Sequence, residues 1–288
     1  MSSAASLPFG KRISLSDGKS IPQLGFGVYE MSGREARRAV REALDHGYRH
    51  IDSAAWYMNE KECGEAINDF IAASDGLVKR ADIYYTSKLR SNSTYEQAVK
   101  AIKKSVSECG LGYLDLYLIH SPYPNRAARL ASWKAMEEAV EQGLVKSIGV
   151  SNYGTRHIDE LLASRPAIRP VINQIDVHPF MARAEDVKYN QDRQIVVEAW
   201  GPLARGMRMN DETMVRIAEG HGKSVAQVLI RYSLQRGCVC IPKSVTTSRI
   251  MENKEVFDFT LSDQEMDTLN ALDEGLVTDW DPIGDSSV

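Results

Sequence analysis

The strongest constraint on the fold is a repeat of short apolar runs that alternate with stretches of helical periodicity. Eight such runs follow one another at intervals of about 25 to 40 residues. They occupy residues 24–28, 48–52, 83–88, 114–120, 145–151, 171–176, 195–200 and 238–244. Nearly continuous apolar runs are typical of strands that helices cover. The pattern therefore predicts eight buried strands.

The segments between the runs carry helix signals. Apolar side chains recur at helical spacing, and each segment ends in a glycine suited to a C-cap, in residues 33–47, 93–110, 131–143 and 224–237. Connections long enough to hold a helix join parallel strands. Eight such units in 288 residues predict an α/β fold, a closed (β/α)8 or TIM barrel. An open doubly wound sheet is the alternative.

The N-terminal part of the chain adds a different motif. Asp17-Gly18 separates two short runs within residues 12–24, which predicts a β-hairpin. We expect this hairpin to cap the bottom of the barrel. No linker or change of composition divides the chain, so we expect a single domain over 1–288, with flexible tails at 1–11 and 283–288.

Composition excludes several classes of function. The 35 basic and 39 acidic side chains are interspersed and give a net charge of -4, without the basic patch of a nucleic-acid-binding protein. No apolar run reaches the length of a membrane-spanning helix, and the first residues lack a signal-peptide core. The four cysteines form no CxxC pair, which favours reduced thiols and a cytoplasmic protein.

Polar side chains collect where the predicted strands end, which is where barrels of this type place their active sites. Asp52, Tyr57, Lys88 and His120 follow strands two to four and would share one sector of the mouth. Each could alone be a strand-end side chain bonded to a loop, but the set is chemically complementary. An ammonium beside a phenol lowers the phenol pKa, and a carboxylate keeps the ammonium charged.

This set predicts a reaction. Tyr57 would act as a general acid, and His120 would orient a substrate oxygen. Hydride delivery to a carbonyl carbon, with proton delivery to its oxygen, amounts to carbonyl reduction. The substrate would be a small-molecule aldehyde or ketone.

With these residues placed, the sequence resembles the aldo-keto reductases over about residues 12–282, and most resembles the short fungal NADPH-dependent members. The resemblance is carried by GYRHIDSAAWYMNE, TSKL, LDLYLIHSP, VKSIGVSNYG, VINQIDVHP, EAWGPLARG and IPKSVTTSRIMEN, in that order along the chain. It implies that Asp52, Tyr57, Lys88 and His120 are the catalytic residues. It also implies a bound nicotinamide cofactor and a monomer.

The resemblance implies a set of cofactor contacts. Ser151, Asn152 and Gln174 match the residues that bond the carboxamide, and Trp200 matches an aromatic, usually Tyr, that stacks on the nicotinamide. The remaining matches are Leu203 and Arg205 in a loop across the pyrophosphate, and Glu252 and Asn253 at the adenine.

The residues after the eighth strand support the same cofactor on physical grounds. No GxGxxG motif is present, so a Rossmann site is not expected. Lys243, Ser244 and Arg249 instead surround the start of a short predicted helix, whose free N–H groups would face a phosphate. Two cations at one place fit the 2′-phosphate of NADPH better than a bare ribose.

The substrate pocket departs from the family pattern. Arg90 and Ser121 stand where many members have tryptophans, and Trp56 and Tyr123 would line the remaining space. We expect an open, polar pocket. Arg90 would attract an anionic or polyhydroxylated carbonyl, or would be a surface arginine, and Trp56 could instead pack on an outer helix.

Two other functions remain as alternatives. A metal-dependent barrel hydrolase could use His50, Asp52, His120 and His178, but Lys88 would compete with a metal, and we expect none. A binding protein that senses the cofactor without much turnover is the second alternative. The complete Asp-Tyr-Lys-His set argues against it.

Overall fold

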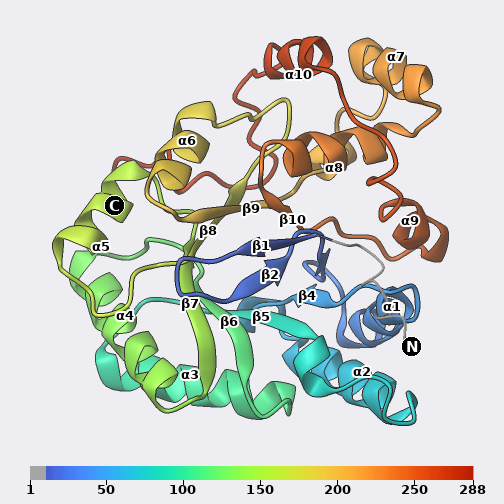
Figure 1. The fold of residues 1–288 in the computed structure, drawn as a ribbon. Coiled ribbons are helices and arrows are strands. Elements are labelled where there is room, and N and C mark those ends of the chain that lie inside the picture. The colour runs from blue at the N-terminus through green and yellow to red at the C-terminus, as the bar shows by residue number, and fades with distance from the viewer. Residues whose placement is uncertain (1–10, 288) are drawn as a thin grey trace.

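The computed structural model describes residues 11–287; the predicted N-terminal tail lies outside the described residues except for Lys11. Eight parallel strands form one curved sheet in sequence order (Figure 1). They are β3 (Phe26–Gly27), β4 (His50–Asp52), β5 (Tyr84–Leu89), β6 (Leu114–Ile119), β7 (Val145–Ser151), β8 (Ile172–Asp176), β9 (Val196–Trp200) and β10 (Val239–Cys240). Each lies within one of the eight predicted runs except at its ends.

The first and last strands close the sheet into a barrel. Leu24 forms a parallel bridge with Cys240, the Gly25 N–H donates to the Cys240 carbonyl at 2.8 Å, and the Gly27 N–H donates to the Pro242 carbonyl at 3.1 Å. The predicted (β/α)8 barrel is therefore confirmed, and the open doubly wound sheet is wrong. The eighth strand is shorter than its run because Pro242 lacks an N–H and cannot continue a ladder.

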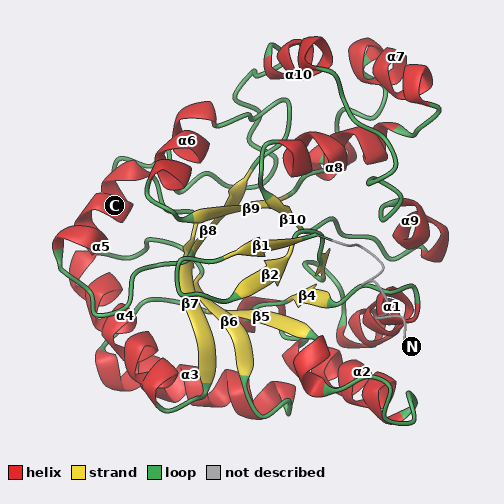
Figure 2. Cartoon of the chain, viewed as in Figure 1, coloured by secondary structure: helices red, strands yellow, loops and turns green. Residues whose placement is uncertain are grey.

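Helices surround the barrel (Figure 2). They are α1 (Gly33–Asp45), α2 (Glu60–Ala72), α3 (Tyr95–Cys109), α4 (Arg126–Glu141), α5 (Thr155–Ala163), α6 (Ala184–Asp192), α7 (Glu212–His221), α8 (Val225–Gln235), α9 (Thr247–Glu252) and α10 (Asp263–Asn270). Short 3-10 turns lie at η1 (Ala55–Tyr57), η2 (Arg80–Asp82) and η3 (Ala204–Gly206). α4 begins before the predicted 131 because the Asn125 side chain caps the Ala128 N–H at 3.1 Å.

The N-terminal hairpin closes one end of the barrel. β1 (Arg12–Ser14) and β2 (Ser20–Pro22) pair antiparallel, as predicted. Leu15 and Ile21 are buried in a cluster with Tyr84 and Val239, which begin β5 and β10. Because these are the N-terminal ends of the strands, the hairpin covers the bottom and leaves the opposite mouth for a site.

The described part of the chain has no helix long and apolar enough to cross a membrane. Its four cysteines are all buried and free, which agrees with the expected reduced thiols. The largest apolar cluster fills the layer between the barrel and its helices. The strands are thus fixed from outside, and the polar side chains discussed next point into the barrel or its mouth.

Candidate active site

Asp52, Lys88 and Tyr57 meet at the mouth. Asp52 ends β4 and lies opposite Thr86 of β5, so Lys88 projects two residues further up the same face of the neighbouring strand. The Lys88 ammonium donates to Asp52 Oδ1 at 2.5 Å, to the Ser53 carbonyl at 2.9 Å and to the Tyr57 hydroxyl at 3.4 Å. All three N–H donors of the ammonium are therefore engaged.

The protonation state of Tyr57 differs from the sequence-based expectation. Burial raises the pKa of Tyr57 to about 12, and the Lys88 ammonium offsets only part of this effect. The expected lowering of the Tyr57 pKa toward neutrality is therefore wrong for the protein by itself. Desolvation of the phenolate outweighs one nearby cation whose charge Asp52 already balances. At neutral pH the phenol keeps its proton.

His120 follows β6 and faces the phenol. Its ring lies edge-on to Tyr57, with ring centroids 5.7 Å apart. Burial and the nearby Lys88 charge lower the pKa of His120 to about 3, so the imidazole is neutral at physiological pH. A neutral imidazole can donate one hydrogen bond to an oxygen placed between it and the phenol.

Two further polar side chains complete the bottom of the mouth. Gln174 of β8 donates from Nε2 to Asp52 Oδ2 and to Glu198 Oε2 of β9, both at 2.8 Å. We call Asp52, Lys88, Gln174 and Glu198 the polar floor. Its members come from β4, β5, β8 and β9 and are all buried. Sequence reasoning did not assign Glu198, although a carboxylate inside the apolar run IVVEAW was a usable signal.

Ser151, Asn152 and Trp200 lie at the rim of the polar floor. The Ser151 hydroxyl donates to the Gln174 carbonyl at 2.8 Å, and Asn152 Nδ2 donates to the His120 carbonyl at 2.9 Å. The Trp200 indole donates to Asn152 Oδ1 at 2.9 Å. The sequence-predicted carboxamide and stacking residues are thus brought together.

Arg205 joins three segments at one side of the mouth. Its guanidinium pairs with Glu30 at 2.9 Å and with Asp279 at 3.4 Å, and the Tyr29 hydroxyl donates to Asp279 at 3.0 Å. Leu203, just before η3, packs on the apolar core. The loop after β9 therefore contacts both the loop after β3 and the C-terminal segment.

Residues 243–249, which we call the β10 turn, carry two free cations. Lys243 and Arg249 are exposed, and neither forms an ion pair within residues 11–287. Ser244 is buried, and its hydroxyl accepts from the Thr246 N–H at 3.1 Å. The turn is tied to α1, since Arg38 donates to the Val245 carbonyl at 2.9 Å. Glu252 and Asn253 end α9 just beyond it.

Trp56 and Arg90 form one unit at the rim. The Trp56 indole N–H donates to the Arg90 carbonyl at 2.6 Å, and the Arg90 guanidinium lies 4.4 Å from the centroid of the indole ring. Trp56 is 51% exposed, so it does not pack beneath an outer helix. Arg90 follows Lys88 by two residues and continues the same edge of the mouth.

The C-terminal segment supplies a site residue that sequence reasoning missed. Trp280 stacks on Tyr123, with ring centroids 6.2 Å apart, and lies 6.3 Å from the His120 ring. Asn92 Nδ2 donates to the carbonyls of Ser121 and Tyr123, which fixes the loop after β6. The TDWDP segment was noted only as a resemblance, because nothing in its local pattern shows that it returns to the mouth.

The C-terminal residues are anchored across the barrel. The Thr278 hydroxyl donates to Asp176 at 3.2 Å, Arg183 pairs with Asp281 at 2.6 Å, and the Tyr123 hydroxyl donates to Asp285 at 2.5 Å. Residues 283–287 of the predicted flexible tail thus make contacts in the structure.

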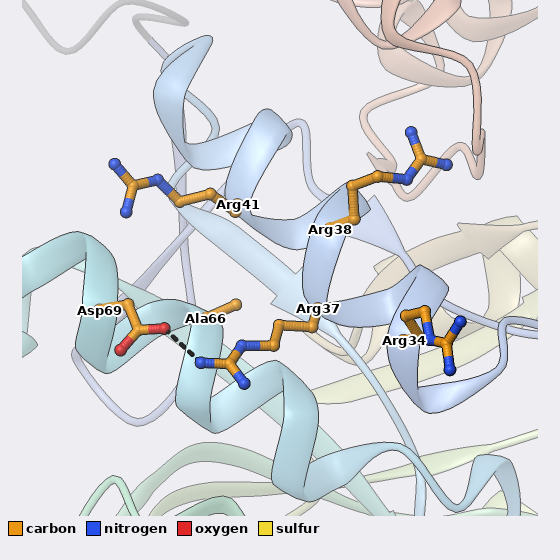
Figure 3. A pocket seen from close by; sticks show the side chains of 6 residues that line it. All are labelled: Arg34, Arg37, Arg38, Arg41, Ala66 and Asp69. Carbon is orange, nitrogen blue, oxygen red and sulfur yellow. Dashed lines mark hydrogen bonds and ion pairs between the residues drawn. The ribbon is translucent and has the colours of Figure 1, made fainter.

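A second basic cluster lies on the outer surface between α1 and α2. A shallow depression of about 300 Å³ is lined by Arg34, Arg37, Arg38, Arg41, Ala66 and Asp69 (Figure 3). Arg37 pairs with Asp69 at 2.7 Å and Glu65 at 3.0 Å, and Arg41 pairs with Asp45 at 2.9 Å. Because carboxylates pair with Arg37, Arg38 and Arg41, most of the positive charge of this cluster is already balanced, unlike that of the β10 turn.

No three His, Cys, Asp or Glu side chains come together in a metal-binding arrangement within the described chain. His50 and His178 lie apart from His120 in the fold: His50 is 3.6 Å from Glu198, and His178 is 3.5 Å from Asp176.

Comparisons with known proteins fit this geometry. The profile of the Aldo/keto reductase family matches residues 23–274. An uncharacterized oxidoreductase of Schizosaccharomyces pombe is 45% identical over 273 residues, which cover 95% of this chain and 98% of the relative. An uncharacterized oxidoreductase of Saccharomyces cerevisiae is 42% identical over 271 residues, covering 93% of this chain and 96% of the relative.

Solved structures give the same result. An aldo/keto reductase from Brucella melitensis has a TM-score of 0.85 at 43% identity, covering 91% of this chain and 99% of its own. An aldo-keto reductase from Bombyx mori, solved in complex with NADP, has a TM-score of 0.87 at 37% identity, covering 93% and 94% of the two chains. The barrel, the order of the motifs and these matches agree, and the chain belongs to the aldo-keto reductase family.

Proposed function

We propose that this oxidoreductase is an NADPH-dependent carbonyl reductase that converts a small-molecule aldehyde or ketone to an alcohol, with Tyr57 as the general acid. The observation that carries the proposal is the Lys88 ammonium. It contacts both Asp52 and the Tyr57 hydroxyl, while neutral His120 lies beside the same phenol.

Tyr57 and His120, together with Lys88 and Asp52 of the polar floor, would account for proton delivery. Tyr57 holds a proton at neutral pH because its pKa is about 12. An alkoxide is a much stronger base than a phenolate, so transfer from Tyr57 to a developing alkoxide is downhill. Lys88 stabilises the phenolate that remains, and Asp52 keeps Lys88 in place. His120 donates a hydrogen bond that orients the carbonyl oxygen.

The cofactor fits the residues around the mouth. NADPH, when bound, supplies the hydride equivalent that reduction of the carbonyl carbon requires. Ser151, Asn152 and Gln174 would hold its carboxamide, and Trp200 would offer an aromatic face. The free cations of the β10 turn would hold a phosphate, with Ser244 beside them. Leu203 and Arg205 would border the pyrophosphate, and Glu252 and Asn253 the adenine.

The rim of the mouth would bind the substrate. Trp56, Tyr123 and Trp280 offer aromatic faces, while Arg90 and Ser121 offer polar groups. This combination suits a carbonyl compound with an anionic or hydroxylated part. We further propose a cytoplasmic, single-domain monomer without nucleic-acid or membrane partners.

Replacement of Tyr57 by Phe tests the acid role. Tyr57→Phe should lower the rate of NADPH oxidation with aldehydes by about 10²–10⁴-fold, because the proton donor is gone. Its affinity for NADPH in a fluorescence titration should stay close to that of the unaltered protein. Tyr117→Phe is the matched control, since it removes a buried hydroxyl that contacts only Ser105 outside the barrel mouth.

The same assay addresses the alternative of a cofactor sensor. A panel of aldehydes, ketoses and keto esters that shows turnover in the unaltered protein but not in Tyr57→Phe supports the reductase. Tight NADPH binding without turnover on any carbonyl would favour the sensor. A Tyr57→Phe variant that keeps most of its rate would refute the acid role.

A further inference from the structure

Glu198 is a buried carboxyl that the proposed reaction does not use. It lies in the middle of β9 inside the barrel and is 0% exposed. Its Oε2 accepts one N–H of Gln174, and the other N–H of the same nitrogen goes to Asp52, both at 2.8 Å. One amide nitrogen therefore bridges two carboxyl groups.

Among the described residues, Lys88 is the only lysine or arginine that forms an ion pair with either of these two carboxyls. Lys88 commits its three N–H groups to Asp52, the Ser53 carbonyl and Tyr57. His50 Nε2 lies 3.6 Å from Glu198 Oε1, but burial lowers the pKa of His50 to about 3, so it is neutral. An unpaired buried carboxylate is costly, so one of the two must be neutral.

Glu198 is the neutral partner. Burial first, and then the charge on Asp52, raise the pKa of Glu198 to about 8, whereas Asp52 has Lys88 in direct contact. The Gln174 hydrogen bond and the Lys88 charge lower the pKa of Glu198, but by less than burial and Asp52 raise it. Glu198 also acts on Tyr84 of β5 and Cys240 of β10, and burial raises the pKa of both. No ionised group of the described chain competes with Gln174 for Glu198 Oε2.

The bridge restricts what Gln174 can offer to a ligand. Both of its N–H groups are consumed inside the barrel, so Oε1 is its only remaining polar atom, and it is an acceptor. The reversed amide would set Oε1 against the Asp52 carboxylate and is excluded by repulsion. Asp52 alone would engage only one of the two N–H groups, and Glu198 engages the other, so that neither is free to bind a ligand.

We propose that Glu198 is a positioning residue: by holding the second N–H of Gln174, it makes the site selective for a nicotinamide whose carboxamide presents its NH₂ group. This inference rests on the proposed cofactor site. Its consequence is a preference for NADP⁺ over the 3-acetylpyridine analogue of NADP⁺, in which a methyl group replaces the NH₂ group and leaves Gln174 Oε1 without a donor.

Binding titrations followed by tryptophan fluorescence test this selectivity without turnover. The unaltered protein should bind NADP⁺ about tenfold or more tightly than the analogue, because a buried acceptor would otherwise lose its partner. In Glu198→Leu the Gln174 amide is held by Asp52 alone and can tilt as a rigid group to share its freed N–H with the acetyl oxygen, so the ratio of the two affinities should fall. Glu198→Gln keeps an oxygen for the Gln174 N–H and should keep most of the ratio.

The control is a buried carboxyl outside the barrel mouth. Glu60 of α2 is 8% exposed and accepts from the Ser87 hydroxyl at 2.5 Å, so Glu60→Leu should leave the ratio unchanged even if it lowers the melting temperature. Glu198→Met serves as the second apolar variant should the leucine variant not fold.

Each outcome has one meaning. Tight NADP⁺ binding with an unchanged ratio in Glu198→Leu, or an equal loss of affinity for both ligands, would overturn this inference alone. An unaltered protein that binds neither ligand would overturn the proposed function and this inference together.

Discussion

The polar floor and the β10 turn are both charged, but they satisfy their charges in opposite ways. In the floor, the Lys88 ammonium is fully buried and engaged by Asp52, Ser53 and Tyr57. In the turn, Lys243 and Arg249 are exposed and form no ion pair with any residue that the structure describes. A buried charge must find its partner within the fold, because water cannot solvate it. An exposed charge can remain free until a ligand arrives.

This contrast explains why basic residues alone do not identify an anion site. The α1 cluster has more cations than the β10 turn, but Arg37, Arg38 and Arg41 already have carboxylate partners. The two groups differ in pairing. The charges of the floor are thus paired by folding and most of those on the α1 surface by ion pairs, whereas the two cations of the β10 turn stay unpaired among the described residues.

The largest expected effect comes from removing the buried cation of the floor. Lys88→Met leaves Asp52 buried without a partner, so the free energy of unfolding should fall by about 3–5 kcal/mol, and turnover should be lost. Urea denaturation measures the change. Lys188→Met, which breaks an exposed pair with Asp192, should change stability by less than about 1 kcal/mol. If Lys88→Met lowered the free energy of unfolding by a similarly small amount, the polar floor would not contribute to stability as expected.

A second effect should appear in the pH dependence of stability. Glu198 has a raised pKa in the folded protein, of about 8, so between its unfolded pKa and pH 8 the native state holds a proton that the unfolded state releases. The stability contributed by this proton is present at acid pH and is lost as the pH rises toward 8. Glu198→Gln cannot ionise and should escape the loss.

The size of this effect follows from linkage. Between pH 5 and pH 8, Glu198→Gln should gain stability relative to the unaltered protein, on the order of 3 kcal/mol. Thermal melts at the two pH values measure the difference. Parallel melting curves for the two proteins across this range would show that Glu198 does not carry a shifted proton.

The β10 turn should respond through binding rather than folding. Arg249→Ala should weaken NADPH by about tenfold or more, since a charge-assisted contact to phosphate is lost, and should change NADH affinity little. Arg37→Ala, from the paired cluster on α1, should change neither affinity. Equal losses of affinity for NADPH and NADH in a titration would contradict the prediction that the β10 turn binds the 2′-phosphate.

The smallest effect is expected at the rim. Arg90 is exposed, so a contact with an anionic substrate is worth no more than about 1 kcal/mol, or a few-fold. Arg90→Met should therefore lower kcat/KM for 4-carboxybenzaldehyde a few-fold relative to benzaldehyde, and added salt should reduce the difference. The neutral aldehyde is the internal control. An unchanged preference would make Arg90 a surface arginine.

The sequence predicted the barrel, and the group of polar residues at its mouth, for clear physical reasons. Parallel strands place their carboxyl ends at one mouth, so the end residues of the runs, Asp52, Lys88 and His120, could be expected together. The hairpin followed from the Asp17-Gly18 turn. These features depend on the periodicity of short segments and on the way parallel strands connect, and both can be recognised in the sequence without knowledge of distant contacts.

Other features depend on burial and on partners distant in sequence. The direction of the Tyr57 pKa shift reverses because desolvation outweighs Lys88, and no local pattern reports how deeply a phenol lies. The two hydrogen bonds that Gln174 donates, to Asp52 and to Glu198, join residues that lie 122 and 24 positions apart in the sequence. Trp280 reaches His120 only because the chain returns across the mouth after α10.

The strap formed by Thr278, Asp279 and Asp285 has a practical consequence. Hydrogen bonds join this strap to Asp176 at the end of β8, to Tyr29 in the loop after β3 and to Tyr123 in the loop after β6. Trp280 lies within the strap. As one of four tryptophans, Trp280 should therefore change its share of the total fluorescence when the entrance of the barrel is altered. Any event that loosens one of the three fastenings would move this fluorophore relative to the His120 ring, without a foreign label.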